Sequence, residues 1–163
     1  MSAGAPPFII RPVEDKHDFL ALMMANWGSH RMMIGLNTYD CAEIDLLGLQ
    51  DDQGATLALA SWTTDGDTAL LCALLSLNPG KGIAVELLEA VKAAARARGA
   101  VRLRAMVTND NIPGLTFYQR HGFRFSGLYV EAIDVYRSVI PTIVRTGYMD
   151  IPVRDALELE IAL

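Results

Sequence analysis

The feature that most constrains the fold is a long amphipathic helix between two strand-like segments. From Ala84 to Ala95, apolar residues recur at three- and four-residue steps, which predicts a helix with one buried stripe. The segment 69–77 is short and apolar, as a buried strand is. The segment 101–107 alternates apolar with polar side chains, which is typical of a strand with one buried face. Strand, helix and strand in this order favour a parallel pair with a right-handed crossover.

The strands ahead of that unit are predicted to be antiparallel. Asp65-Gly66 suits the tight turn of a hairpin, so residues 55–63 and 69–77 should pair across it. Residues 46–50 precede them across another polar turn. Further strands are expected at residues 8–12, 123–128 and 157–161, and helices at residues 16–27, 113–121 and 131–138. Residues 29–39 are ambiguous, and a second helix is the expectation there.

Length and composition place the chain among globular proteins. With 163 residues it is expected to form one domain, residues 1–163. Hydrophobic residues make up 52% and charged residues 20%, which excludes a disordered chain. The longest apolar run, residues 69–75, is far short of the roughly 20 residues of a membrane span, and the start lacks the pattern of a secretory signal. Two cysteines and three scattered histidines show no metal spacing. We therefore expect a cytoplasmic protein with no metal and no membrane partner.

Charge is unevenly distributed along the chain. The net charge is −5, yet residues 81–124 carry eight bases and three acids, which leaves −10 on the remainder. An acidic protein with one basic segment disfavours general nucleic-acid binding. Such a segment fits a compact anionic ligand held at one place, or equally a solvated helix face.

The loop before the long helix has the composition of a phosphate site. Asn78-Pro79-Gly80-Lys81-Gly82 leads into the helix, whose first amides have no intrahelical partner. A P-loop would need Ser or Thr after the lysine, where Gly82 stands. A dinucleotide fingerprint would need a third glycine, where Val85 stands, and it would follow a parallel strand. A coenzyme A pyrophosphate loop is the third interpretation.

Two blocks of sequence resemble the GNAT superfamily of N-acetyltransferases. Residues 79–84, Pro-Gly-Lys-Gly-Ile-Ala, resemble that family's Arg/Gln-x-x-Gly-x-Gly/Ala loop. Residues 111–123 resemble its Asn-x-x-Ala-x-x-Phe-Tyr-x-x-x-Gly-Phe segment, in the expected order and at the expected separation. Pro79 and Gly114 depart from the family pattern at one position each. The resemblance implies an α/β (α+β) fold of GNAT type: a mixed, mostly antiparallel sheet of six to seven strands, flanked by helices, with a splayed central parallel pair.

The resemblance also implies a cosubstrate, acetyl-coenzyme A, and the residues that bind it. Its pyrophosphate would lie on the amides of residues 80–84, and its pantetheine arm in the splay between residues 69–77 and 101–107. The expected cofactor-binding residues are Leu75, Leu77, Gly80, Lys81, Gly82, Ile83, Ala84, Asn111 and Tyr118. Asn111 also suits an ordinary helix cap.

The reaction that the resemblance implies is direct attack of a primary amine on the thioester, through a tetrahedral intermediate. A backbone amide near residues 75–77 would stabilise the oxyanion, and Tyr118 would protonate the departing thiolate. Tyr118 alternatively serves as a core aromatic beside Phe117. The sequence does not identify the base that deprotonates the amine. Glu43, Asp45 and Asp150 are candidates only because they are acids outside the cofactor segment. Cys72 is expected to be core rather than nucleophile.

The sequence does not identify the acceptor, and it leaves two alternative functions open. The acceptor would be a small molecule or peptide, and the −10 outside residues 81–124 predicts an acidic pocket mouth and a cationic amine. Members of the family often form homodimers. The alternatives are a non-catalytic acyl-coenzyme A binding regulatory module and a nucleotide-binding interaction protein.

Overall fold

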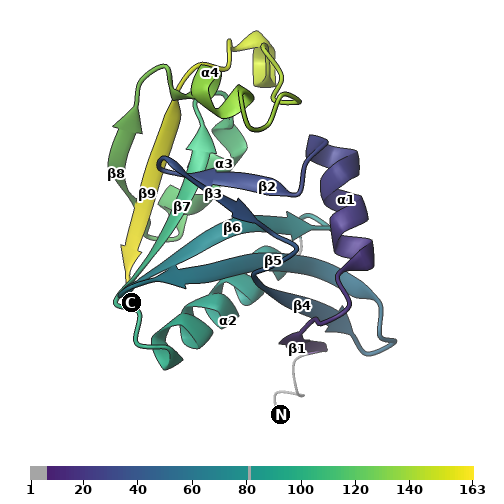
Figure 1. Ribbon diagram of the computed structural model, residues 1–163. Coiled ribbons are helices and arrows are strands. Elements are labelled where there is room, and N and C mark those ends of the chain that lie inside the picture. The colour runs from purple at the N-terminus through teal and green to yellow at the C-terminus, as the bar shows by residue number, and fades with distance from the viewer. Residues whose placement is uncertain (1–6, 81) are drawn as a thin grey trace.

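The computed structural model describes residues 7–80 and 82–163 and shows a mixed sheet with helices on both faces (Figure 1). In that part of the chain the sheet has seven strands, in the order β1-β4-β5-β6-β7-β9-β8, and β2 and β3 form a separate hairpin. The elements are β1 (Phe8–Pro12), α1 (His17–Trp27), β2 (Arg31–Ile34), β3 (Asn37–Asp40), β4 (Asp45–Asp51), β5 (Thr56–Asp65), β6 (Thr68–Ser76), α2 (Ile83–Ala97), β7 (Arg102–Thr108), α3 (Ile112–Arg120), β8 (Arg124–Tyr129), α4 (Ala132–Arg137), a 3-10 turn (Tyr148–Asp150) and β9 (Ala156–Ala162).

The sheet confirms the mixed architecture predicted from the sequence. Every neighbouring pair of strands is antiparallel except β6 and β7, which are joined through α2 and are parallel. The last strand, β9, lies between β7 and β8. No helix in the described ranges is both long and apolar enough to cross a membrane.

Two hydrophobic clusters lie on the two faces of the sheet. The apolar stripe of α2, including Leu87, Leu88 and Val91, packs on one face against β5, β6 and β7. Phe19 and Met23 of α1 pack on the other face together with Ile34 of the hairpin. Figure 1 shows α2 and α3 behind the sheet and α1 with β2 and β3 in front of it. Each face is therefore covered by its own set of elements.

The parallel pair opens along its length. Backbone pairing between β6 and β7 runs only from Thr68 opposite Arg102 to Leu71 opposite Ala105. A β-bulge shifts the register of β6 against β5 just beyond Leu71. A bulge bends a strand and raises its twist, and in Figure 1 β6 and β7 start together near the C-terminus and then diverge. This opening is the predicted splay.

The segment after α1 is a β-hairpin, so the expectation of a second helix at residues 29–39 was wrong. Met32 pairs with Tyr39 across the hairpin, and Gly35 takes a φ of 62° at the turn. The methionines of this segment favour helix in isolation. Burial of Ile34 against α1 and the sheet outweighs that local preference.

Candidate active site

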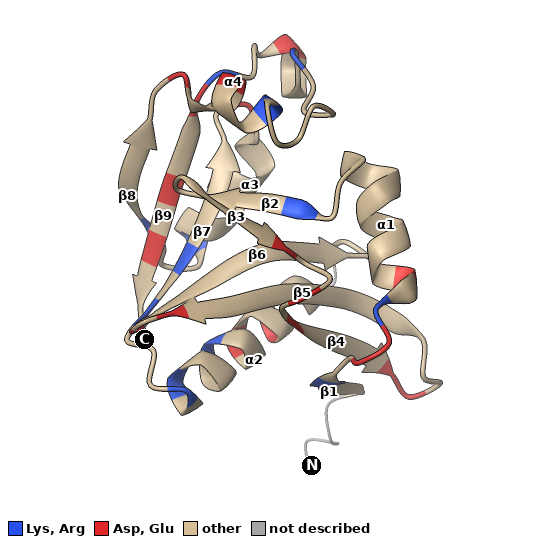
Figure 2. Ribbon diagram, viewed as in Figure 1, with Lys and Arg blue, Asp and Glu red and all other residues tan. Residues whose placement is uncertain are grey.

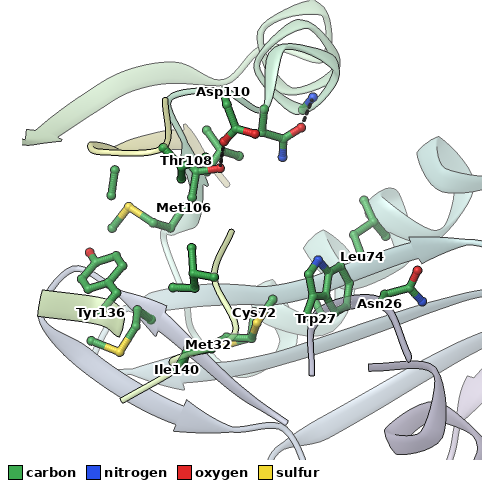
Figure 3. Close-up of a pocket in the computed structure, with 18 of the residues that line it drawn as sticks. Asn26, Trp27, Met32, Cys72, Leu74, Met106, Thr108, Asp110, Tyr136 and Ile140 are labelled. Atoms are coloured by element: carbon green, nitrogen blue, oxygen red, sulfur yellow. Dashed lines mark hydrogen bonds between the residues drawn. The ribbon is translucent and has the colours of Figure 1, made fainter. Parts of the chain in front are cut away.

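A pocket of about 1000 Å³ lies where β6 and β7 separate. Its walls come from both sides of the sheet: Tyr118 and Ala84 on the side of α2 and α3, and Trp27 and Met32 on the side of α1 and the hairpin. The pocket therefore passes through the sheet at the splay. Figure 3 shows Trp27, Met32 and Tyr136 gathered around this space, with Thr108 and Asp110 on one side of it.

The strand edges that face the opening can be identified from the register. The Leu77 amide donates to the Leu57 carbonyl at 2.8 Å, so the odd-numbered residues at this end of β6 point their backbone groups toward β5. Leu74 and Ser76 consequently point theirs toward β7. On β7, the Asn109 amide donates to the Asp155 carbonyl beside β9, so Met106 and Thr108 point theirs toward β6.

The register corrects two predicted site residues. Leu77 was expected to offer an amide near the thioester, but that amide is already bonded to Leu57. Leu75 lies opposite Leu59 in the β5 ladder, and neither Leu75 nor Leu77 lines the pocket. Leu74 and Ser76 line it instead. The residue pattern does not predict which residues of β6 face the opening, because the bulge that shifts the register is not visible in the sequence.

The glycine loop leads into α2 beside the pocket. Gly80 and Gly82 have φ of 91° and 69°, a backbone conformation that favours glycine, and a Cβ at either would meet nothing within 4 Å. Ala84 lines the pocket, while the Ile83 side chain is buried in the α2 core, so only its backbone is available to a ligand. Lys81 lies outside the described residues. The open space, the glycines and the free amides of the first helical turn together suit a phosphate group.

The basic residues of the segment 81–124 do not form a patch at the pocket. Arg98 pairs with Asp45 at 2.6 Å, Arg104 with Glu160 at 2.6 Å, and Lys92 with Glu89 at 2.8 Å. None of the bases described in this segment lines the pocket. The described lining therefore does not support the interpretation of these basic side chains as the site of an anionic ligand.

Asn111 caps α3 and also lines the pocket. Its Oδ1 accepts a hydrogen bond from the Gly114 amide at 3.0 Å. A Cβ at position 114 would lie 2.6 Å from Asn111 Nδ2. The glycine in place of the family's alanine therefore gives the Asn111 amide its room above the helix.

Tyr118 lines the pocket from α3 on the side of the glycine loop. Its ring packs edge-on against Phe117 and Phe123, with centroids 5.3 and 5.1 Å away. Burial raises the pKa of the phenol above its ordinary value, so the hydroxyl keeps its proton at neutral pH. Within the described residues the hydroxyl has no hydrogen-bond partner in the protein. The two phenylalanines therefore fix the ring, and the hydroxyl proton is free to be donated to a ligand.

The other end of the pocket, on the side of α1, is apolar and was not foreseen. Here Met24, Trp27, Met32 and Tyr136 contribute side chains, joined by Ile140, Ile143 and Val144 from the loop after α4. These residues come from segments far apart in the sequence, and no motif marks them. The only signal available was the excess of methionine and aromatic residues near the end of α1.

The charge of the lining contradicts the predicted acidic mouth. In the described chain the lining has one carboxylate, Asp110, and one guanidinium, Arg31. Figure 2 shows the single basic position on β2. The acids responsible for the −10 lie elsewhere.

Among the described residues, Asp110 is the carboxylate that lines the pocket, and the three acids considered as bases do not line it. Glu43, Asp45 and Asp150 do not line the pocket, and a hydrogen bond from Arg98 lowers the pKa of Asp45. Asp110 accepts a hydrogen bond from Thr108 Oγ1 at 2.5 Å and another from the Tyr148 amide at 3.1 Å. A Cβ on Gly147 would lie 1.9 Å from Asp110 Oδ2, so the glycine is needed for this approach.

Cys72 lines the pocket but has the properties of a core thiol. It is 5% exposed, and its Sγ lies 3.9 Å from the Leu70 carbonyl. Burial raises the pKa of the thiol, which keeps it protonated and weakly nucleophilic.

Comparison with known proteins identifies the family and the fold. A model of the acetyltransferase (GNAT) family matches residues 79–123, which span the glycine loop and Tyr118. The uncharacterized protein YxbD of Bacillus subtilis (strain 168) is 34% identical over 85% of this chain and 87% of its own length. A GNAT family acetyltransferase from Elizabethkingia anophelis with acetyl-CoA bound has a TM-score of 0.71 at 16% identity, covering 98% of this chain and 100% of that one. A Bacillus subtilis acetyltransferase in complex with CoA also has a TM-score of 0.71, at 15% identity, covering 96% of this chain and 99% of that one. These likenesses confirm the predicted fold.

Proposed function

We propose that this chain, which belongs to the GNAT superfamily of acetyltransferases, transfers the acetyl group of acetyl-CoA to a primary amine. The observation that carries the proposal is the pocket through the splay. It joins a glycine loop at one end to a compartment large enough for an acceptor at the other. A thioester threaded between β6 and β7 would present its carbonyl carbon to that compartment.

The cosubstrate end offers backbone groups in the positions that acetyl-CoA requires. The free amides at the start of α2 suit the pyrophosphate. The open edges at Leu74 and Ser76 of β6, and at Met106 and Thr108 of β7, suit the amides of the pantetheine arm, which can pair with them as an added strand does. The Asn111 amide and Gly80, Gly82, Ile83 and Ala84 complete the proposed binding surface, with Lys81 outside the described residues.

The chemical step is assigned to the middle of the pocket. The amine nitrogen bonds to the thioester carbonyl carbon, and the carbon–sulfur bond then breaks. An amide of the β6 edge, at Leu74 or Ser76, would donate to the oxyanion. The Tyr118 phenol, which is protonated at neutral pH, would give its proton to the leaving thiolate.

The amine must lose a proton before or during attack. Asp110 is the carboxylate of the described lining, and the hydrogen bonds from Thr108 and the Tyr148 amide fix its position. We assign it the role of attracting the acceptor's ammonium and receiving that proton, directly or through water.

The test is thiol release from acetyl-CoA in the presence of a panel of primary amines, with a thermal melt on the same sample. Acetyl-CoA at 100 times its Kd should stabilise the fold by roughly 2.7 kcal/mol, and at least one amine should accelerate thiol release. Stabilisation without thiol release for any amine would favour the non-catalytic binding module. An unshifted melt at millimolar acetyl-CoA would reject both functions.

A further inference from the structure

The acceptor end of the pocket is built from apolar side chains at separate places in the chain. Met24 and Trp27 come from the end of α1, Met32 from β2 and Met106 from β7. Ile140, Ile143 and Val144 close the same space from the loop after α4. Met24, Trp27 and Val144 keep 49%, 37% and 58% of their surface exposed although they line a pocket. Exposed apolar surface that lines a concave site marks a place for an apolar ligand.

Three hydroxyl groups of this compartment are bonded within the protein. The Tyr136 hydroxyl donates to the Gly35 carbonyl, so the residue presents its ring to the pocket rather than a free polar group. The Thr142 hydroxyl donates to the Trp27 carbonyl at 2.5 Å, which ties the loop to the end of α1. The Thr108 hydroxyl donates to Asp110. A polar acceptor body would therefore lose its water and gain no partner from these three hydroxyls.

The charges of the lining suit one ammonium group and no more. Asp110 can face a single amine, whereas the Arg31 guanidinium has no ion-pair partner in the described chain and would repel a second positive charge. A polyamine would have to place its additional ammonium groups beside Arg31 or against methionine and tryptophan. Both placements are unfavourable.

We infer that the acceptor is a primary amine carried on an apolar body, an arylalkyl or alkyl amine, seated among Trp27, Met32 and Tyr136. This inference rests on the proposed acetyl transfer and names its substrate class. The unbranched methionine side chains adapt to the shape of the guest. The aromatic rings of Trp27 and Tyr136 provide flat apolar contact.

The first experiment compares matched acceptors by thiol release: 2-phenylethylamine, spermidine and glutamate. The expected kcat/KM for 2-phenylethylamine exceeds that for either polar amine by about 10²-fold, the scale of discrimination that an apolar pocket reaches. A higher kcat/KM for spermidine or glutamate would overturn the inference and leave the proposed acetyl transfer intact.

The second experiment reads binding without turnover. The chain has two tryptophans; Trp62 is buried beneath the Arg98 guanidinium, whereas Trp27 lines the pocket. In protein saturated with CoA, 2-phenylethylamine should change the tryptophan emission saturably, and spermidine at the same concentration should not. Trp27→Phe should remove the change. Saturable binding of 2-phenylethylamine without thiol release would leave the inferred pocket standing while the proposed function fails. No response to 2-phenylethylamine, or a saturable response to spermidine, would overturn the inference.

A matched pair of variants separates the pocket from general stability. Trp27→Ala should raise the KM for 2-phenylethylamine about tenfold and leave the KM for acetyl-CoA unchanged. Ile9→Ala removes an exposed apolar side chain, 49% accessible, from β1 at the far edge of the sheet and should change neither constant. Equal effects of the two variants on the amine KM would overturn the assignment of Trp27 to the acceptor.

Discussion

In the proposed function, the two ends of the pocket would recognise their ligands with different parts of the chain. The cosubstrate end offers backbone groups: Gly80, Gly82 and the start of α2, together with the open edges of β6 and β7. The acceptor end offers side chains from α1, β2 and the loop after α4. Backbone recognition requires glycine and a helix start at fixed spacing, so it leaves a short motif. Side-chain recognition by apolar groups leaves no local pattern, because any residue of suitable shape serves.

Tyr118→Phe tests the point where the two ends meet, and we expect the largest effect there. The variant keeps the ring and its contacts with Phe117 and Phe123 but deletes the proton. Turnover should fall about 10²–10⁴-fold through kcat, the usual contribution of a positioned acid. The melting temperature should change little, since the hydroxyl makes no hydrogen bond within the described residues. Tyr39→Phe, at a tyrosine of β3 that does not line the pocket, is the control and should retain turnover. Turnover at the wild-type level in Tyr118→Phe would remove the phenol from the mechanism.

Gly82→Glu tests the cosubstrate end alone. A carboxylate at the start of α2 should repel the pyrophosphate and abolish stabilisation by acetyl-CoA, which is roughly 2.7 kcal/mol at 100 times Kd. Gly82 has a φ of 69°, so the substitution also strains the backbone. Gly99→Glu supplies the control, because Gly99 lies just past the other end of α2 with a φ of 86° and equally open surroundings. Acetyl-CoA should stabilise the Gly99 variant as it does the wild type; a full thermal shift in Gly82→Glu would contradict the site.

Gly147→Ala tests the position of the carboxylate at the acceptor end. The added methyl would lie 1.9 Å from Asp110 Oδ2, so the carboxylate must move and lose its bond from the Tyr148 amide. We expect a loss of about 1–3 kcal/mol in the free energy of unfolding, a higher KM for the amine and an unchanged KM for acetyl-CoA. Asp110→Asn keeps the shape and removes the charge, and it should lower turnover while largely retaining stability. Undiminished turnover in both variants would show that Asp110 takes no part.

Asp45→Asn tests a carboxylate outside both ends and should have the smallest effect. Asp45 and Arg98 form an exposed ion pair, so the free energy of unfolding should fall by at most about 1 kcal/mol and turnover should not change. The hydrogen bond from Arg98 lowers the pKa of Asp45. A depressed pKa stabilises the fold above the unfolded pKa of about 3.9, and that contribution is lost as the pH falls through the folded value. The difference between variant and wild type should therefore be present at pH 7 and vanish near pH 2. Reduced turnover would restore Asp45 as a candidate base.

The sequence predicts the fold well where local pattern and tertiary packing agree. The stripe of α2 and the alternation of β7 both place their apolar residues in one core, and β1 was predicted with its observed bounds. The hairpin β2–β3 was not predicted, because Met32 and Met33 suit a helix locally and only packing of Ile34 on α1 and the sheet decides the outcome.

The candidate site likewise has one part that the sequence motif predicts and one part that only the tertiary structure decides. Gly80, Gly82 and Tyr118 lie where the motif placed them, beside or in the pocket. Which residues of β6 face the opening depends on the β-bulge in that strand and on its pairing with β5. The sequence does not show either feature, so it predicted Leu75 and Leu77, whereas Leu74 and Ser76 line the site. The acidic mouth was inferred from a summed charge, which carries no information about where each carboxylate lies.

Residue-resolved amide hydrogen exchange with and without acetyl-CoA tests the central claim most directly. The amides of Leu74 and Ser76 face the splay unpaired, whereas the Leu77 amide is already bonded to Leu57. Acetyl-CoA should slow exchange at Leu74, Ser76 and the first amides of α2 by at least about tenfold and leave Leu77 unchanged. Unaltered exchange at Leu74, Ser76 and the start of α2, at saturating acetyl-CoA, would contradict the placement of the cosubstrate in the splay.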